Sequence, residues 1–317
     1  MTILVLGSSG LVGRKLTRRL LDEGHPVVAC DVAAPAGAVR EETEGAVHVR
    51  ADIARLDQVL GVIKEHGVSR IALLSYIMGP LMSPEHREIL RAIEVNVTGV
   101  ANVLEAARLS DARRVVFLST VGTYGPPALY GDRPVNEDDM LAPTSMYGRM
   151  KALNESVVDR YAALYGLETV KVRPSAILGP GSTIWPARLL ERVALGEPGV
   201  VPYAPQARDN IIAAEDLAVL LSRLLTGERP RHDTYLGAAH NITMTELVDV
   251  IRELMPGARF EYPNPDRRPT YPGSFDNARA VAEFEWEPRG VRETVLAHID
   301  DVRRDAGLPA LANDGRA

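Results

Sequence analysis

The 317-residue sequence contains very little cysteine, and its single cysteine is Cys30. One thiol cannot form a disulfide within the chain, so nothing ties the protein to an oxidising compartment. The sequence also lacks any run of about 18 apolar residues, the length that a membrane-spanning helix needs. Its N-terminus enters an apolar run at once, without the basic and hydrophobic segments of a signal peptide. We therefore expect a cytoplasmic protein that does not associate with a membrane.

An excess of positive charge is absent as well. The net charge is −6 and the isoelectric point is about 5.7. Binding to nucleic-acid phosphates needs a basic face, so we expect no nucleic-acid partner. The seven histidines are scattered along the chain without the spacing of metal ligands. We therefore expect no metal site.

Short apolar runs are present, and they alternate with longer stretches of helical period. The runs lie at residues 3–6, 26–30, 46–50, 70–74, 114–118 and 168–172. Continuous apolar strands separated by amphipathic helices are typical of a parallel sheet that is covered on both faces. The pattern predicts an α/β fold with a Rossmann-like, doubly wound parallel sheet.

After about residue 173 the sequence pattern changes, because prolines and glycines cluster between shorter helical segments. We expect helices near 184–195, 214–226, 243–254 and 290–305. The chain is therefore predicted to have a Rossmann-like domain at 1–174 and a smaller C-terminal α/β lobe at 175–317. Residues 209–237 are expected to return to the first domain.

A glycine triplet follows the first predicted strand and opens the first predicted helix. Gly7, Gly10 and Gly13 lie in the segment LVLGSSGLVG. Glycine permits the unusual backbone angles of such a turn and lets the chain approach a pyrophosphate closely. The free N–H groups of the helix N-terminus then attract the phosphate charge. The segment predicts a dinucleotide site.

An acidic residue stands at the end of the second predicted strand. The carboxylate of Asp31 can accept hydrogen bonds from both ribose hydroxyls of adenosine and would repel a 2′-phosphate. No arginine follows it directly, so NAD is favoured over NADP. Asp52 and Ile53 follow the third strand. Asp52 suits either the adenine amino group or the N-terminus of the next helix.

Tyr147 and Lys151 are four residues apart in SMYGRMK and share a face if this segment is helical. A free tyrosine is a poor base at neutral pH, since its pKa is near 10. A neighbouring ammonium and a positively charged nicotinamide both favour the phenolate. Ser119 and Thr120 follow the fifth predicted strand, where ligands bind in parallel sheets. Asn96 lies in the helix expected to flank this site.

Together these residues resemble the extended short-chain dehydrogenase/reductase superfamily, the NAD-dependent epimerase/dehydratase group. The resemblance runs over essentially the whole chain. The segments that carry it include GSSGLVG, NVTGVANVLEAA, LSTVGTYG, YGRMK, VRPSAILGPG and ARDNIIAAEDLA, together with Asp31 and Asp52-Ile53.

The resemblance implies roles for individual residues. Tyr147 would be the catalytic base, Thr120 would bind the same substrate oxygen, and Lys151 would hold the nicotinamide ribose and lower the pKa of Tyr147. Contacts to NAD are expected from Gly7, Ser9, Gly10, Leu11, Val12, Gly13, Asp31, Asp52, Ile53, Leu74, Ser75, Asn96, Ser119, Tyr147, Lys151 and Pro174. Contacts to substrate are expected from Thr120, Ser175 and Arg208. The family usually forms dimers through two helices, here 84–108 and 146–165.

The sequence also departs from the family at informative positions. Members that dehydrate or decarboxylate carry acidic residues after the catalytic threonine, whereas this chain has Val121 and Gly122. The segment LLSYIMGPLM makes the pocket wall after the fourth strand unusual. Arg208 favours a nucleotide diphosphate, although a surface position or an ion pair with Asp209 explains it equally well. Residues 255–286 instead resemble dehydrogenases of small substrates, such as threonine dehydrogenases.

We therefore expect an NAD-dependent enzyme that removes hydride from a secondary alcohol of a sugar or sugar-nucleotide, epimerase-like rather than a 4,6-dehydratase or decarboxylase. The first alternative is an NAD-dependent dehydrogenase or reductase of a small non-nucleotide metabolite. The second is a non-catalytic NAD-sensing protein, which the intact Thr120, Tyr147 and Lys151 argue against. A homodimer is expected.

Overall fold

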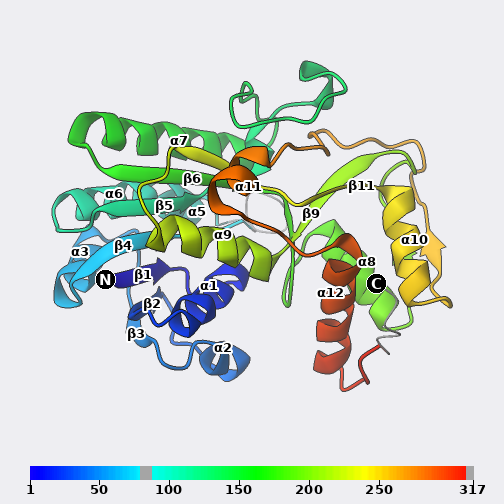
Figure 1. Ribbon diagram of the computed structural model, residues 1–317, viewed down its shortest axis with the longest axis horizontal. Coiled ribbons are helices and arrows are strands. Elements are labelled where there is room, and N and C mark those ends of the chain that lie inside the picture. Colours follow the sequence, from blue (N-terminus) through cyan, green and yellow to red (C-terminus); the bar gives the residue numbers. More distant parts are fainter. Residues whose placement is uncertain (79–87, 312–317) are drawn as a thin grey trace.

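A seven-stranded, all-parallel sheet forms the centre of the protein (Figure 1). The computed structural model describes residues 1–78 and 88–311. The strand order is β10-β6-β5-β4-β1-β2-β3. The strands are β1 (Thr2–Leu6), β2 (Val27–Asp31), β3 (Val47–Arg50), β4 (Val68–Leu73), β5 (Arg114–Leu118), β6 (Glu168–Pro174) and β10 (Thr234–Gly237). The order reverses between β1 and β4, where doubly wound sheets bind their ligands.

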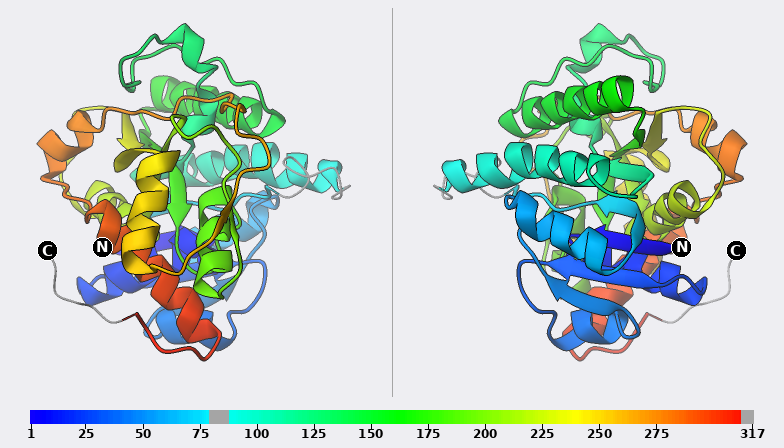
Figure 2. Two further views of the ribbon diagram at one scale, coloured as in Figure 1. Left: turned by 90° about the vertical axis from the view of Figure 1, so that its right-hand side faces the viewer. Right: turned by 90° about the vertical axis from the view of Figure 1, so that its left-hand side faces the viewer.

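Helices cover both faces of this sheet, which explains why its strands are almost continuously apolar. One face carries α3 (Leu56–Glu65), α6 (Val100–Arg108) and α7 (Met146–Tyr165), which lie side by side in Figure 2. The other carries α1 (Leu11–Asp22) and α9 (Ala214–Thr226), which pack together, and α11 (Ala278–Phe284). Short elements complete this part of the chain: α2 (Gly37–Glu42), α5 (Ile89–Ile93), η2 (Val121–Thr123) and η3 (Pro127–Leu129).

A smaller lobe lies beside the large sheet and has its own apolar core (Figure 1). It contains a three-stranded sheet of β7 (Ala176–Leu178), β9 (Arg208–Ala213) and β11 (His240–Thr243). A two-stranded sheet joins β8 (Gly199–Val200) to β12 (Phe260–Glu261). Its helices are α8 (Trp185–Ala194), α10 (Met244–Leu254) and α12 (Val291–Asp305). Within 209–237, α9 and β10 join the large sheet, whereas β9 lies in the small one.

The predicted doubly wound fold is confirmed, and the six predicted strands and four C-terminal helices agree with β1–β6, α8, α9, α10 and α12 within a few residues. The segment EVNVTGVANVLEAA differs in one respect. Its first part is a π-helix, η1 (Glu94–Gly99), between α5 and α6. Such insertions of wider turns often mark functional sites. In the part of the chain that the structure describes, no helix is long and apolar enough to cross a membrane.

Candidate active site

The glycine loop between β1 and α1 packs tightly against its own backbone and against the loop after β4. Gly7 has φ +85°, and a Cβ there would lie 2.8 Å from the backbone nitrogen of Ser75. A Cβ on Gly13 would lie 2.0 Å from the carbonyl oxygen of Gly7. No side chain caps α1 at Gly10, and its first turn has no acidic residue. The N–H groups of Leu11 and the following residue are therefore suited to bind a phosphate.

Asp31 lies at the carboxyl end of β2, next to this loop. Its carboxylate accepts backbone hydrogen bonds from Ser9 at 3.0 Å and from Val32 at 2.8 Å. Each carboxylate oxygen has a further lone pair with which to accept a ribose hydroxyl. The uncapped helix, the close glycines and this carboxylate fit the pyrophosphate and ribose of NAD. Sequence inspection missed Arg50, whose backbone lies opposite that of Asp31 in the register of β2 and β3. It missed this neighbour because the register of a parallel pair is not visible in the sequence.

Asp52 and Ile53 follow β3, and both interact with other residues of the protein. Asp52 accepts a hydrogen bond from the backbone of Ala54 at 3.0 Å and forms an ion pair with Arg91 at 2.6 Å. The carbonyl of Ile53 accepts a hydrogen bond from Asn102 at 3.0 Å. The helix-capping alternative for Asp52 is wrong, because the N-cap of α3 is Arg55 and Asp52 instead closes a turn ahead of it. A contact with adenine stays a prediction.

The start of α7 is held against the turn that follows β5. Ser145 caps α7 by accepting the N–H of Gly148 at 3.0 Å. A Cβ on Gly148 would lie only 2.1 Å from the carbonyl oxygen of Gly122, so only glycine allows this close approach. A Cβ on Gly122 would in turn lie 3.3 Å from Thr120 Oγ1 and 3.6 Å from Tyr147 Cε1. The predicted hydroxyl and the predicted base are therefore neighbours.

The protein alone does not favour the phenolate form of Tyr147. Burial raises the pKa of the Tyr147 hydroxyl, and the interaction with the Thr120 hydroxyl only partly opposes this. Burial also lowers the pKa of Lys151 to about 7, although Glu155 acts in the opposite direction. Lys151 Nζ donates to the carbonyl of Leu118 at 2.5 Å. A lowering of the Tyr147 pKa by Lys151 stays a prediction.

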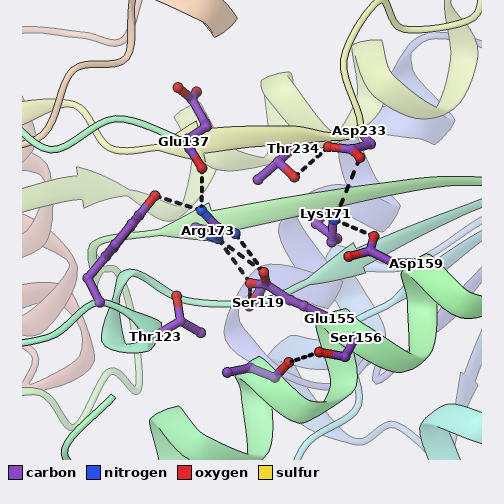
Figure 3. Close-up of polar contacts among 12 residues, drawn as sticks. Ser119, Thr123, Glu137, Glu155, Ser156, Asp159, Lys171, Arg173, Asp233 and Thr234 are labelled. Carbon is purple, nitrogen blue, oxygen red and sulfur yellow. Dashed lines mark hydrogen bonds and ion pairs between the residues drawn. The ribbon is translucent and has the colours of Figure 1, made fainter. Parts of the chain in front are cut away.

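A buried ion pair joins α7 to β6. Arg173 on β6 donates to Glu155 on α7 from Nη2 at 2.7 Å and from Nε at 3.0 Å. Its Nη1 donates to the hydroxyl of Tyr124 at 2.7 Å and to the carbonyl of Glu137 at 2.9 Å (Figure 3). The hydroxyl of Ser119 donates to the same Glu155 carboxylate. The network fixes α7 to β5 and β6, and sequence inspection did not identify Glu155 or Arg173 as part of the site.

The predicted helix residue Asn96 positions a loop. It is fully buried in η1, and its amide both donates to and accepts from the backbone of Ile77, at 2.8 Å each. Its own carbonyl accepts from Asn154 on α7 at 2.7 Å. Asn96 thus connects α7 to the loop after β4 that contains Leu74, Ser75 and Tyr76. In this arrangement its side chain is committed to the loop, and a direct contact with NAD stays a prediction.

The substrate-side residues differ in their surroundings. Ser175 follows Pro174 at the end of β6, is 8% exposed, and its hydroxyl has no hydrogen-bond partner among the described residues. Arg208 begins β9 and is exposed, and no ion pair with Asp209 is formed within the described chain. Asp209 is instead buried and accepts hydrogen bonds from Trp185 at 2.7 Å and Tyr271 at 2.9 Å. Burial raises the pKa of Asp209 to about 6.

Most predicted residues lie at one edge of the large sheet, because they follow the carboxyl ends of its parallel strands. Gly7 follows β1, Asp31 ends β2, Ser75 follows β4, Thr120 follows β5 and Ser175 follows β6. The structure brings Thr120, Tyr147 and Lys151 together, while Arg208 belongs to the smaller lobe. Described residues hold no group of three His, Cys, Asp or Glu side chains placed to bind a metal.

Comparison with known proteins finds relatives in sequence and structures of the same fold. A UDP-glucose 4-epimerase of Mycolicibacterium smegmatis is 32% identical over 187 residues, which are 57% of this chain and 57% of that protein. The structure of a Thermus thermophilus UDP-glucose 4-epimerase in complex with NAD is similar with a TM-score of 0.80 at 24% identity, covering 96% of this chain and 99% of that chain. The L-threonine dehydrogenase of Clostridium difficile is similar with a TM-score of 0.82 at 19% identity, covering 96% and 98%.

The sequence model of the NAD dependent epimerase/dehydratase family matches residues 3–236, which span the large sheet from β1 into β10. This chain therefore belongs to that family, within the extended short-chain dehydrogenases/reductases, and is an NAD-dependent enzyme.

Proposed function

We propose that the enzyme removes hydride from a secondary alcohol of a sugar or sugar-nucleotide and returns it, as an epimerase does. The proposal rests chiefly on one observation: Thr120 and Tyr147 are neighbours at the carboxyl edge of the sheet, and Lys151 lies one helical turn beyond Tyr147. The glycine loop and Asp31 lie along the same edge. The similarity to UDP-glucose 4-epimerases supports the substrate class.

Each residue of the cluster has a defined task in this reaction. Tyr147, as phenolate, takes the proton of the substrate hydroxyl, and Thr120 donates a hydrogen bond to the same oxygen. Lys151 holds the nicotinamide ribose. NAD supplies the hydride acceptor and a positive charge that favours the phenolate. That charge offsets the effect of burial, which raises the pKa of Tyr147 in the protein alone.

Elimination of water or carbon dioxide needs a further acid or base next to the reacting carbon. The two residues after Thr120 are Val121 and Gly122, whose side chains cannot exchange a proton. A Cβ on Gly122 would contact both Thr120 and Tyr147, so this position directly adjoins the catalytic groups. The proposed reaction is therefore confined to hydride and proton transfer.

A second candidate is net dehydrogenation or reduction of a small non-nucleotide metabolite. The similarity to an L-threonine dehydrogenase supports it. So does the substrate lobe, in which Asp209 is enclosed by Trp185 and Tyr271 while Arg208 faces solvent. A non-catalytic NAD sensor is disfavoured, since it would not need Thr120 and Tyr147 side by side.

A substrate panel separates these candidates. The enzyme is incubated with NAD and either UDP-glucose, UDP-glucuronic acid or L-threonine, and both NADH absorbance and the product sugars are followed. The epimerase proposal predicts an isomerised sugar without accumulation of NADH, because hydride returns to the same molecule. Steady accumulation of NADH with L-threonine, and no sugar product, would replace it with the dehydrogenase candidate.

We also propose a homodimer formed through the consecutive elements α5, η1 and α6 and through α7, which lies beside them on one face (Figure 2). Apolar side chains are exposed there, with exposed fractions of 72% for Leu90, 47% for Ile89, 38% for Ile93 and 50% for Leu153. Two further apolar residues of these helices contribute less exposed surface, since Val97 is partly buried and Val100 is fully buried.

Sedimentation measures this assembly. The wild-type protein is expected to sediment with twice the mass of one chain. Leu90→Glu combined with Leu153→Glu should yield monomers, because two charges would be buried without partners. Leu129→Glu is the control, since Leu129 is 51% exposed, like Leu153, but belongs to η3, which is not one of the elements proposed to form the interface. A wild-type monomer would contradict the proposed dimer.

A further inference from the structure

Tyr76 is an aromatic residue in the loop after β4, and its ring lies directly against the two proposed catalytic side chains of α7. The face of the ring lies 3.9 Å from Lys151 Nζ, measured to the ring centroid. The rings of Tyr76 and Tyr147 meet edge to face, with 5.4 Å between centroids and an interplanar angle of 87°. Both geometries are attractive, the first as a cation–π contact and the second as an edge-to-face pair.

The Tyr76 ring is one of several groups that shield the Lys151 ammonium group from solvent. Lys151 is only 3% exposed. Its Nζ donates to the carbonyl of Leu118 and lies 4.8 Å from the ring centroid of Phe117. Phe117 belongs to β5 and is 1% exposed, so its ring is fixed within the core. Tyr76 lies on a loop and is only partly buried, so rotation of its side chain can uncover Lys151.

The hydroxyl of Tyr76 is poorly satisfied in this position. Its oxygen is buried and has no hydrogen-bond partner among the residues that the structure describes. A buried phenol without a partner is costly, and buried tyrosines normally find one. The covering position is therefore favoured by the ring and disfavoured by the hydroxyl.

We propose that Tyr76 competes with the nicotinamide ribose for Lys151, so that cofactor binding requires the Tyr76 ring to leave the ammonium group. The inference rests on the proposed role of Lys151 in holding that ribose. A lysine that is already covered by a ring face cannot also offer its donors to a ribose approaching from that side. The observed affinity for NAD is then the intrinsic affinity multiplied by the fraction of molecules in which Lys151 is uncovered.

Two substitutions at this position are expected to act in opposite directions on the dissociation constant of NAD, measured by titration calorimetry. Tyr76→Ala removes the cover, so NAD should bind more tightly, by about 3- to 10-fold for a cation–π contact of ordinary strength. Tyr76→Phe keeps the ring and removes the unsatisfied hydroxyl. The covering position becomes more stable, so NAD should bind several-fold more weakly.

Weaker or unchanged binding of NAD by Tyr76→Ala would overturn the proposal, since the ring would then be a wall of the cofactor site or a bystander. Unchanged or tighter binding by Tyr76→Phe would overturn it as well, and this conservative variant is informative even if the alanine variant fails to fold. Tyr165→Ala is the control, since Tyr165 ends α7 with 53% exposure and should leave the dissociation constant unchanged.

Lys151→Met separates this inference from the proposed function. If Lys151 holds the ribose, Lys151→Met should bind NAD at least about 10-fold more weakly, the loss expected for a charge-assisted hydrogen bond. Unchanged binding by Lys151→Met would overturn the role of Lys151 and, with it, the competition proposed for Tyr76. If Lys151→Met binds NAD more weakly but Tyr76→Ala and Tyr76→Phe do not shift the dissociation constant in opposite directions, only the competition is overturned.

Discussion

Replacing Tyr147 with phenylalanine should lower turnover by about 10²- to 10⁴-fold, the usual contribution of a general acid–base group. The substitution removes one oxygen and keeps the ring that packs edge to face on Tyr76. The fold should therefore be preserved. Turnover is measured with whichever substrate of the panel the wild-type enzyme converts, and the fold is checked by urea denaturation.

A matched control lies on the same helix. Tyr165→Phe makes the identical chemical change at the exposed C-terminal end of α7 and should leave turnover unchanged. Full activity of Tyr147→Phe would remove Tyr147 from the reaction. Equal losses in both variants would indicate that α7 is merely sensitive to substitution.

Replacing Glu155 with glutamine should cost about 3–5 kcal/mol in the free energy of unfolding, because it leaves the Arg173 guanidinium buried without its counter-charge. Arg173 and Glu155 are 5% and 3% exposed. Arg173 would retain only neutral acceptors, which are the Tyr124 hydroxyl, the Glu137 backbone carbonyl and the amide oxygen of the substituted side chain. The charge of Glu155 also raises the pKa of Lys151, so Glu155→Gln should lower that pKa below about 7.

The free energy of unfolding is measured by urea denaturation of both proteins. Glu105→Gln provides the comparison, since Glu105 pairs with Arg108 on the surface of α6, where solvent screens the interaction. That control should change stability much less. A Glu155→Gln protein as stable as wild type would mean that the ion pair does not anchor α7 to β6.

Features encoded locally could be predicted from the sequence. Each strand of the large sheet is an apolar run between helical stretches, so the periodicity alone indicates β1 to β6. Gly7 and Gly13 were recognisable because their positions in a strand–turn–helix segment leave no room for a side chain. The spacing of Tyr147 and Lys151 on one helix was likewise visible in the sequence.

Features that depend on tertiary packing could not be predicted. Glu155 and Arg173 lie 18 residues apart on different elements, and only the packing of α7 on β6 joins them. The contact of Tyr76 with Lys151 depends on how Asn96 holds the loop after β4. The pKa of Tyr147 depends on how deeply the phenol is buried, and this burial opposes the phenolate more than the sequence suggested.

In the proposed reaction, hydride leaves a carbinol carbon of the substrate at the site formed by Thr120, Tyr147 and Lys151. The most direct test is a single turnover with UDP-glucose deuterated at the 4-position of the sugar, quenched early, with mass spectrometry of the cofactor. The proposal predicts deuterated NADH in the wild-type enzyme and none in Tyr147→Phe. An isomerised sugar formed without deuterium ever reaching the cofactor would contradict it.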